Sequence, residues 1–153
     1  GLSFTIATAR NYDSAHPILN GLNLNLPVIL FNGVYLTDFN SGSILEYSHF
    51  IEKTVVENML ELALPRGIDP FIYTFGEKLK LYYQRASNPG SQAYVKSLEG
   101  DGRLNQVNCF EFQEEEKISG FLLIDTHDHL EPIYQSLQEK HFGVFGLWTN
   151  DLQ

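Results

Sequence analysis

Two uninterrupted apolar stretches near the start of the chain constrain its fold more than any other feature. Residues 2–7 are apolar and β-branched without alternation, and residues 26–31 form a second continuous apolar run. Such runs are typical of strands covered on both faces, as in parallel sheets. Between them, Asp13 or Ser14 can cap a short helix to about Leu22, with Pro17 tolerated in its first turn. The order strand, helix, strand predicts a βαβ unit with a right-handed crossover.

The pattern changes after Gly33, where "VYLTDFNSGSILEYSH" predicts an antiparallel hairpin that turns around residues 40–42. A helix is expected over residues 50–64, and a second hairpin in "PFIYTFGEKLKLYYQ". Further along, we expect a short helix over residues 89–98, a strand in "KISGFLLID", a helix opened by a capping box of Asp128 and Glu131, and a last strand in "FGVFGLWT". Residues 104–116 stay unassigned. The fold class is therefore α/β plus α+β: a parallel βαβ unit over residues 1–33, then an α+β domain with a mostly antiparallel sheet over residues 34–153.

Charge and composition exclude several classes of function. The net charge of −9 and the pI of about 4.9 oppose binding to nucleic acid, which depends on Lys and Arg displacing counterions from phosphates. No apolar run approaches the roughly 20 residues of a membrane-spanning helix, and no signal peptide is recognisable. Cys109 is the only cysteine, which rules out an internal disulfide and favours a cytoplasmic protein. A lone cysteine between apolar residues is usually a small buried hydrophobic side chain.

The stretch "IATAR" suggests where a ligand binds. A strand followed by a helix places the Thr8 hydroxyl and the next backbone N–H groups at the carboxyl edge of a parallel sheet, where open α/β sheets bind ligands. A hydroxyl and the positive end of a helix suit a phosphoryl oxygen, and Arg10 adds a permanent cation. The plainer interpretation is that Thr8 merely ends a strand and Arg10 is solvated.

The stretches "FTIATARNYDSAHPIL" and "LPVILFNGVYL" resemble the haloacid dehalogenase-like hydrolase superfamily, in its Cof-like branch with a large inserted cap. In that family a hydrophobic strand ends in a phosphate-contacting Thr within an "ATGR"-like stretch, and the next core strand ends in "NGA". By this resemblance Thr8 and Arg10 bind or order the phosphate, and Asn32 and Gly33 lie at the mouth of the site. Ala9 and Val34 depart from the family's usual Gly and Ala.

Other motifs of that family are missing. The seven Asp residues (13, 38, 69, 101, 125, 128 and 151) form no Asp-x-Asp pair, which would supply the nucleophile and the acid/base. The family's phosphate-holding Lys and its magnesium-binding acidic loop are not recognisable either. The resemblance thus implies the middle of a phosphatase that uses Mg²⁺ and acts on a small phosphorylated metabolite, a sugar or cofactor phosphate. The piece alone is expected to be inactive, without bound metal, and to self-associate through exposed core surfaces. The alternative is a non-catalytic α+β module that binds a small molecule or a protein.

Three further groups of residues have side chains that could take part in binding or catalysis. "DTHDH" at residues 125–129 contains four possible metal ligands, but Asp128 is better used as a helix cap, so we assign no metal site. "EEEK" at residues 114–117 is read as a solvated turn. Aromatic residues on the second hairpin can face the core or a substrate, and core packing is the favoured interpretation. These are Tyr73, Phe75, Tyr82 and Tyr83.

Overall fold

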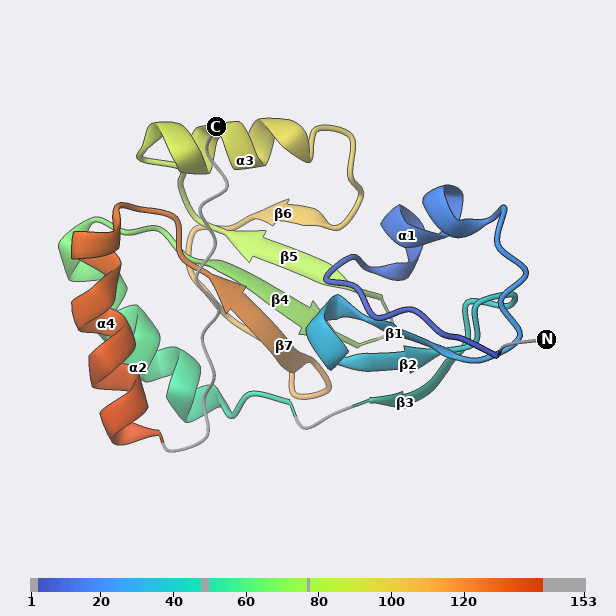
Figure 1. The fold of residues 1–153 in the computed structure, drawn as a ribbon. Helices are drawn as coiled ribbons and strands as arrows, with labels where there is room; N and C mark the ends of the chain where they lie inside the picture. The colour runs from blue at the N-terminus through green and yellow to red at the C-terminus, as the bar shows by residue number, and fades with distance from the viewer. Residues whose placement is uncertain (1–2, 48–49, 77, 142–153) are drawn as a thin grey trace. The chain divides into compact units, whose positions relative to one another are not determined.

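The computed structural model describes residues 3–47, 50–76 and 78–141 (Figure 1). The chain divides into two compact units, Gly1–His49 and Phe50–Gln153, which are described separately. It is a mixed α/β chain with one antiparallel and one mixed sheet. Within the described residues, no helix has the length and apolarity needed to cross a membrane.

Over residues 3–47, the first unit contains one helix, one short 3₁₀ turn and a three-stranded sheet of order β1-β2-β3. Both strand pairs are antiparallel, and a bulge follows Leu36 in β2. The elements are α1 (Tyr12–Leu19), β1 (Val28–Leu30), η1 (Phe31–Gly33), β2 (Tyr35–Thr37) and β3 (Ile44–Tyr47).

The predicted first strand is present only in part. Residues near Ala7 run parallel to β1, with a single bridge between Ala7 and Ile29. The parallel direction is as predicted, but no continuous strand forms over the described residues 3–7. The helix that follows starts at Tyr12, so Pro17 lies inside it and not in its first turn as expected.

The predicted hairpin around residues 40–42 is confirmed, and its turn is built by Asp38. The Asp38 carboxylate accepts hydrogen bonds from the Ser41 amide and hydroxyl, both at 2.7 Å, and these bonds lower the pKa of Asp38. Gly42 then takes a left-handed φ of 73°. Because β2 pairs with β1, this hairpin belongs to the first unit. The unit boundary follows His49, whereas the predicted domain boundary followed Gly33.

Among its described residues, the second unit has a four-stranded sheet of order β6-β5-β4-β7. The neighbours of β4 are antiparallel to it, and β5 and β6 are parallel. The mostly antiparallel sheet, the second hairpin and the helix after it agree with the sequence prediction. The elements are α2 (Lys53–Ala63), η2 (Leu64–Arg66), β4 (Phe71–Phe75), β5 (Lys80–Tyr83), α3 (Pro89–Ser97), β6 (Leu104–Gln106), β7 (Lys117–Leu122) and α4 (His127–Lys140).

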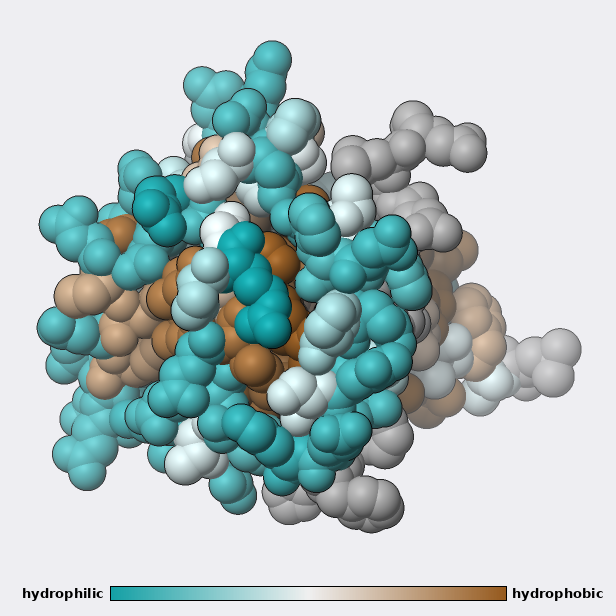
Figure 2. All heavy atoms as spheres, turned by 90° about the vertical axis from the view of Figure 1, so that its left-hand side faces the viewer, coloured by the Kyte–Doolittle hydropathy of each residue, from teal (hydrophilic) through white to brown (hydrophobic). Residues whose placement is uncertain are grey.

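The core of this unit lies between the sheet and the helices α2 and α4 (Figure 1). Met59 from α2, Ile72 from β4 and Ile133 from α4 are each no more than 1% exposed. Burying side chains of this size contributes about 1.5–3 kcal/mol each, so this layer dominates the stability of the unit. Figure 2 shows apolar residues gathered at the centre of the face turned to the viewer, inside a ring of hydrophilic residues.

Two predictions at the end of the chain have different outcomes. The helix α4 is present, but its N-cap is Thr126, and Asp128 is an exposed residue of its first turn, so the expected capping box at Asp128 is wrong. Residues 104–116, left unassigned from the sequence, contain the short strand β6. The last predicted strand, "FGVFGLWT", lies outside the described residues.

Replacing Gly42 tests the hairpin turn. A Cβ atom at Gly42 would lie 2.9 Å from ring atoms of Tyr12, in addition to the left-handed φ of 73°. We expect Gly42→Ala to destabilise the protein by about 1–3 kcal/mol, measured by urea unfolding. Gly21→Ala is the control, because a Cβ there meets nothing within 4 Å and its φ is not left-handed. Equal stability of the two variants would contradict this account of the turn.

Candidate functional site

The Thr8 segment is anchored to β1 by backbone hydrogen bonds. The Ile29 amide donates to Ile6 O at 2.8 Å, and the Thr8 amide donates to Ile29 O at 2.9 Å. These bonds are those of a parallel pair, in which one residue bonds to two partners on the neighbouring segment. Thr8 is therefore fixed at the carboxyl end of a parallel pairing, as the sequence predicted.

Two more backbone bonds bring the loop after Thr8 against the turn after β1. The Phe31 amide donates to Arg10 O at 3.0 Å, and the Asn32 amide donates to Thr8 O at 3.2 Å. The four residues proposed from the sequence, Thr8, Arg10, Asn32 and Gly33, thus lie on two loops that hydrogen-bond directly to each other.

The turn after β1 has an unusual backbone. Phe31, Asn32 and Gly33 have φ values of 53°, 55° and 93°, three left-handed residues in succession. Asn and Gly tolerate this region, whereas a bulky residue such as Phe is a true outlier and costs on the order of 1–3 kcal/mol. The ring of Phe31 stacks on Tyr35 at 5.8 Å, which offsets part of that cost. Backbone strain of this kind is often found at functional turns.

The Thr8 side chain is placed to donate a hydrogen bond. Its Oγ1 accepts the Arg10 amide at 3.2 Å, which leaves the hydroxyl hydrogen available to a ligand. Thr8 is half-buried and Arg10 is exposed. The Ala9 amide between them has no acceptor in the ranges that the structure describes. A hydroxyl, an amide and a guanidinium in one tripeptide are groups that bind an anion.

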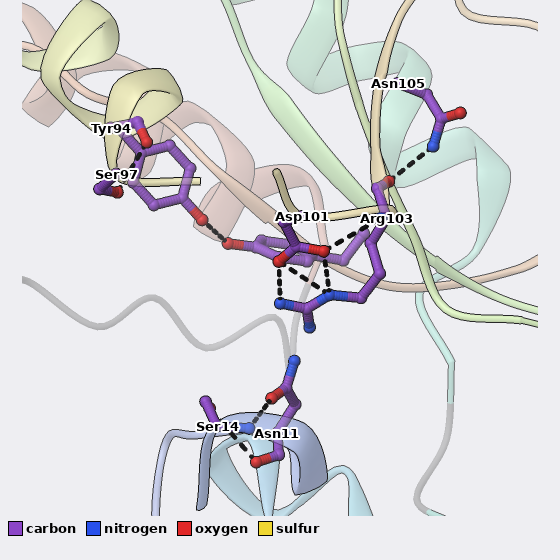
Figure 3. Close-up of polar contacts among 8 residues, drawn as sticks. Asn11, Ser14, Tyr94, Ser97, Asp101, Arg103 and Asn105 are labelled. Atoms are coloured by element: carbon purple, nitrogen blue, oxygen red, sulfur yellow. Dashed lines mark hydrogen bonds and ion pairs between the residues drawn. The ribbon is translucent and has the colours of Figure 1, made fainter. Parts of the chain in front are cut away.

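The helix after this loop is capped by Asn11, which the sequence analysis did not select. Asn11 is buried, with 6% exposure, and its Oδ1 accepts the Ser14 amide at 2.9 Å (Figure 3). The cap directs the free N–H groups and the positive end of α1 to the side of the chain where the Thr8 loop ends. Asp13 and Ser14, the predicted caps, lie within the helix instead.

The histidines of "DTHDH" each lie beside an acidic residue in the described part of the chain. His129 Nδ1 lies 2.8 Å from Asp125 Oδ1, and His127 Nε2 lies 3.5 Å from Glu131. These are separate exposed pairs, and no group of three potential metal ligands occurs among the described residues.

Glu116 is buried at the centre of a polar cluster, which corrects the interpretation of "EEEK" as a wholly solvated turn. Its exposure is 6%, while Glu114 and Glu115 are exposed. Its Oε1 accepts hydrogen bonds from Lys80 Nζ at 2.8 Å and from Tyr82 Oη at 2.7 Å. Burial raises the pKa of Glu116, but the bonds from Lys80 and Tyr82 outweigh it, and the net pKa lies below its ordinary value.

Cys109 is exposed, so the expectation of a buried cysteine is wrong. Its thiol donates to Glu111 Oε1 at 3.2 Å, and this carboxylate raises the pKa of Cys109. A raised pKa leaves less thiolate, which argues against a nucleophilic role.

The chain belongs to the haloacid dehalogenase-like hydrolase family, whose sequence profile matches residues 1–151. Among solved structures, a haloacid dehalogenase-like hydrolase from Bacteroides thetaiotaomicron is similar with a TM-score of 0.68 and 16% identity, over 96% of this chain and 54% of that one. A haloacid dehalogenase-like hydrolase from B. subtilis has a TM-score of 0.63 and 16% identity, over 90% of this chain and 55% of that one.

A protein from Thermotoga maritima is similar with a TM-score of 0.63 and 18% identity, over 95% of this chain and 52% of that one. The chain thus spans about half the length of these structures. No curated protein matches it.

Glu116→Gln tests the buried cluster. The variant keeps an acceptor but loses the charge that pairs with Lys80, and we expect a loss of about 1–3 kcal/mol at pH 7. Because folding lowers the pKa of Glu116, its stabilisation is present above the ordinary value of 4.5 and is lost as the pH falls through the lower folded pKa. The stability gap between wild type and variant, measured by urea unfolding from pH 7 to 3, should therefore shrink in acid.

The matched control is Glu115→Gln, one residue earlier and exposed. It should change stability little at any pH. A gap between Glu116→Gln and wild type that does not depend on pH would show that the charge of Glu116 contributes nothing.

Proposed function

We infer that this chain is part of a cytoplasmic, Mg²⁺-dependent phosphatase and that its Thr8 loop binds the phosphoryl group of a small phosphorylated metabolite, such as a sugar or cofactor phosphate. One observation carries the inference: the hydrogen-bonded pairing of the Thr8–Arg10 loop with the strained turn at residues 31–33. Membership of a hydrolase family supports the same reaction class.

The chemistry of this loop is recognition. The Thr8 hydroxyl donates to one phosphoryl oxygen, the Ala9 amide can donate to the same or a neighbouring oxygen, and Arg10 offsets the negative charge. The net charge of −9 repels a phosphate at long range, so a local cation is needed at the site. Asn32 and Gly33, held against Thr8, line the entrance.

The isolated chain lacks the means to cleave a phosphate ester. Phosphoryl transfer needs an in-line nucleophile and a cation that offsets developing charge on the transferred group. The sequence has no Asp-x-Asp pair, and the described residues offer no metal site. In the complete protein, by family resemblance, an aspartate pair and Mg²⁺ supply these functions. The role proposed for this chain is to hold the phosphate and to carry the cap, which by the same resemblance is the α+β domain predicted over residues 34–153.

The Thr8 site can be tested with inorganic phosphate as the probe, by titration of the ¹⁵N-labelled chain followed by NMR. We expect the amides of residues 8–11 to shift, and Thr8→Val to weaken binding about tenfold, because one hydrogen bond to a charged group is lost. Thr5→Val is the matched control, because Thr5 lies in the same segment as Thr8. Its hydroxyl donates to Pro27 O instead of facing the proposed ligand.

The same samples should hydrolyse no p-nitrophenyl phosphate with Mg²⁺ present. Equal phosphate binding by Thr8→Val and wild type would contradict the assignment of the site. Turnover that scales with chain concentration would contradict the proposal that this chain holds the phosphate without cleaving the ester. A wild-type chain that shows no phosphate-dependent shifts would favour the alternative of a non-catalytic module.

We also propose that the first unit self-associates. In the described part of the chain, the exposed large hydrophobic side chains all belong to this unit: Phe4, Ile18, Leu22, Leu26, Ile44, Leu45 and Tyr47. All four residues of β3 are exposed, and β3 is an edge strand. Exposed apolar edge strands promote pairing between chains.

Sedimentation velocity tests this association. We expect the average mass to rise with protein concentration, and Leu45→Lys to reduce the effect because a charge on an edge strand opposes pairing. Ser43→Lys adds the same charge just outside β3 and should change association less. A single monomeric species at every concentration would rule the proposal out.

A further inference from the structure

The first unit contains Asn-Gly dipeptides at two exposed turns. Asn20 with Gly21 follows the helix α1, and Asn32 with Gly33 forms the turn after β1. A Cβ atom built at either glycine would meet nothing within 4 Å, so the space beside both glycines is open. In an Asn-Gly dipeptide the glycine nitrogen can attack the preceding side-chain amide with little hindrance, because glycine carries no side chain and its backbone rotates freely.

The side chain of Asn32 is available for this reaction. Asn32 is exposed, and its side-chain amide forms no hydrogen bond within the ranges that the structure describes. Asn11, in the same unit, is different: it is buried, and its amide oxygen accepts the Ser14 amide at 2.9 Å. Of these two asparagines near the Thr8 loop, Asn32 is the one whose amide carbon solvent and a neighbouring nitrogen can reach.

The backbone of Asn32 opposes the reaction while the turn stays closed. Ring closure requires the Asn32 side chain and the Gly33 nitrogen on the same side of the Asn32 Cα–C bond, and at a ψ of 31° they lie on opposite sides. The turn is held in this form by the Asn32 amide, which donates to Thr8 O at 3.2 Å. The Phe31 amide adds a second bond, to Arg10 O at 3.0 Å. The reaction therefore needs the turn to separate from the Thr8 loop.

The strain in this turn favours such opening. Phe31 has a left-handed φ of 53°, which a bulky residue adopts only at a cost in free energy. That cost is relieved whenever the turn opens. Exposed segments with few buried contacts are also those that open locally at low free energy.

We propose that Asn32 is a site of spontaneous deamidation and that the reaction lowers the affinity of the Thr8 loop for phosphate. The Gly33 backbone nitrogen gives up its proton to water or a buffer base and attacks Asn32 Cγ. The bond from Cγ to the side-chain nitrogen breaks, and this nitrogen takes up a proton and leaves as ammonia. Water then opens the resulting succinimide ring at either carbonyl carbon, which yields aspartate or isoaspartate. Both products carry a carboxylate where a neutral amide stood.

The new carboxylate acts on a site that has to attract an anion. The Asn32 amide is bonded to Thr8 O, so the charge arises on a residue that directly contacts the one proposed to bind the phosphate. Like charges repel, and the net charge of −9 already opposes an anion. In isoaspartate the main chain also runs through the former side chain, which alters the turn. This effect on affinity rests on the proposed function, whereas the reaction at Asn32 does not.

The first experiment follows the wild-type chain at mildly alkaline pH by peptide mapping, with fragmentation that distinguishes asparagine, aspartate and isoaspartate. We expect conversion at both Asn20 and Asn32. With inorganic phosphate at about ten times its dissociation constant, conversion at Asn32 should slow about tenfold relative to Asn20, because phosphate stabilises the closed pairing of turn and loop. Asn20 is the internal control, since it is the C-cap of α1 and lies outside the turn that pairs with Thr8. Sodium chloride at equal ionic strength should leave the ratio of the two rates unchanged.

The second experiment introduces the charge directly. Asn32→Asp should weaken phosphate binding about fivefold in the NMR titration of residues 8–11, because a unit charge near the site repels the phosphate through solvent. Asn20→Asp is the matched control, since it adds the same charge at the other exposed Asn-Gly turn of the same unit and should change the affinity little. Equal phosphate affinities of the two variants would contradict the effect on binding.

The failure of this proposal and that of the phosphate site are distinguishable. No conversion at Asn32 would overturn the deamidation site, whether or not Asn20 converts. If phosphate shifts residues 8–11 but does not slow conversion at Asn32, the phosphate site stands and the link between turn and loop is wrong. If Asn32 converts while phosphate shifts nothing in the wild type, the deamidation site stands, and the phosphate assignment fails together with the effect on affinity.

Discussion

The parallel pairing of residues 6–8 with Ile29 is the constraint on which the first unit's site depends. Two backbone bonds, Ile29 to Ile6 and Thr8 to Ile29, set the position of Thr8 along the sheet edge. The next residues then have little freedom, because Arg10 O and Thr8 O are both engaged by the turn after β1. The site is held by main-chain bonds, which makes its geometry insensitive to many side-chain changes nearby.

This dependence explains why two departures from the family pattern are tolerated. Ala9 stands where the family usually has Gly, but within the described residues only Phe31 and Asn32 among non-glycines have a positive φ. Alanine at position 9 therefore meets no backbone penalty. Val34, at φ −69° and ψ −36°, is likewise in ordinary right-handed space. The strained residue is instead Phe31, which no sequence motif marked.

Hydrophobic periodicity predicted the order of elements well, because it reflects which faces are buried. It could not decide between neighbouring residues of equal propensity: Asn11, Asp13 and Ser14 are all good caps, and only packing selects Asn11. Nor could it identify Glu116 as the buried member of three consecutive glutamates, because that depends on the contacts of Lys80 and Tyr82 with Glu116 in the folded chain. The backbone pairing of Thr8 and Asn32 was predictable, because such bonds are to be expected where neighbouring segments of a sheet end together. Their role in a binding site stays a prediction.

The two faces of the second sheet are packed by different kinds of contact. Beneath α2 and α4 the contacts are apolar, and apolar packing fixes a helix on a sheet at a lower cost in free energy than buried polar contacts. On the α3 face, a partly buried ion pair and two half-buried phenols stand next to the helix, although ion pairs removed from water often stabilise no better than apolar residues of similar volume. The stability of the second unit is therefore expected to depend mainly on the apolar layer beneath α2 and α4.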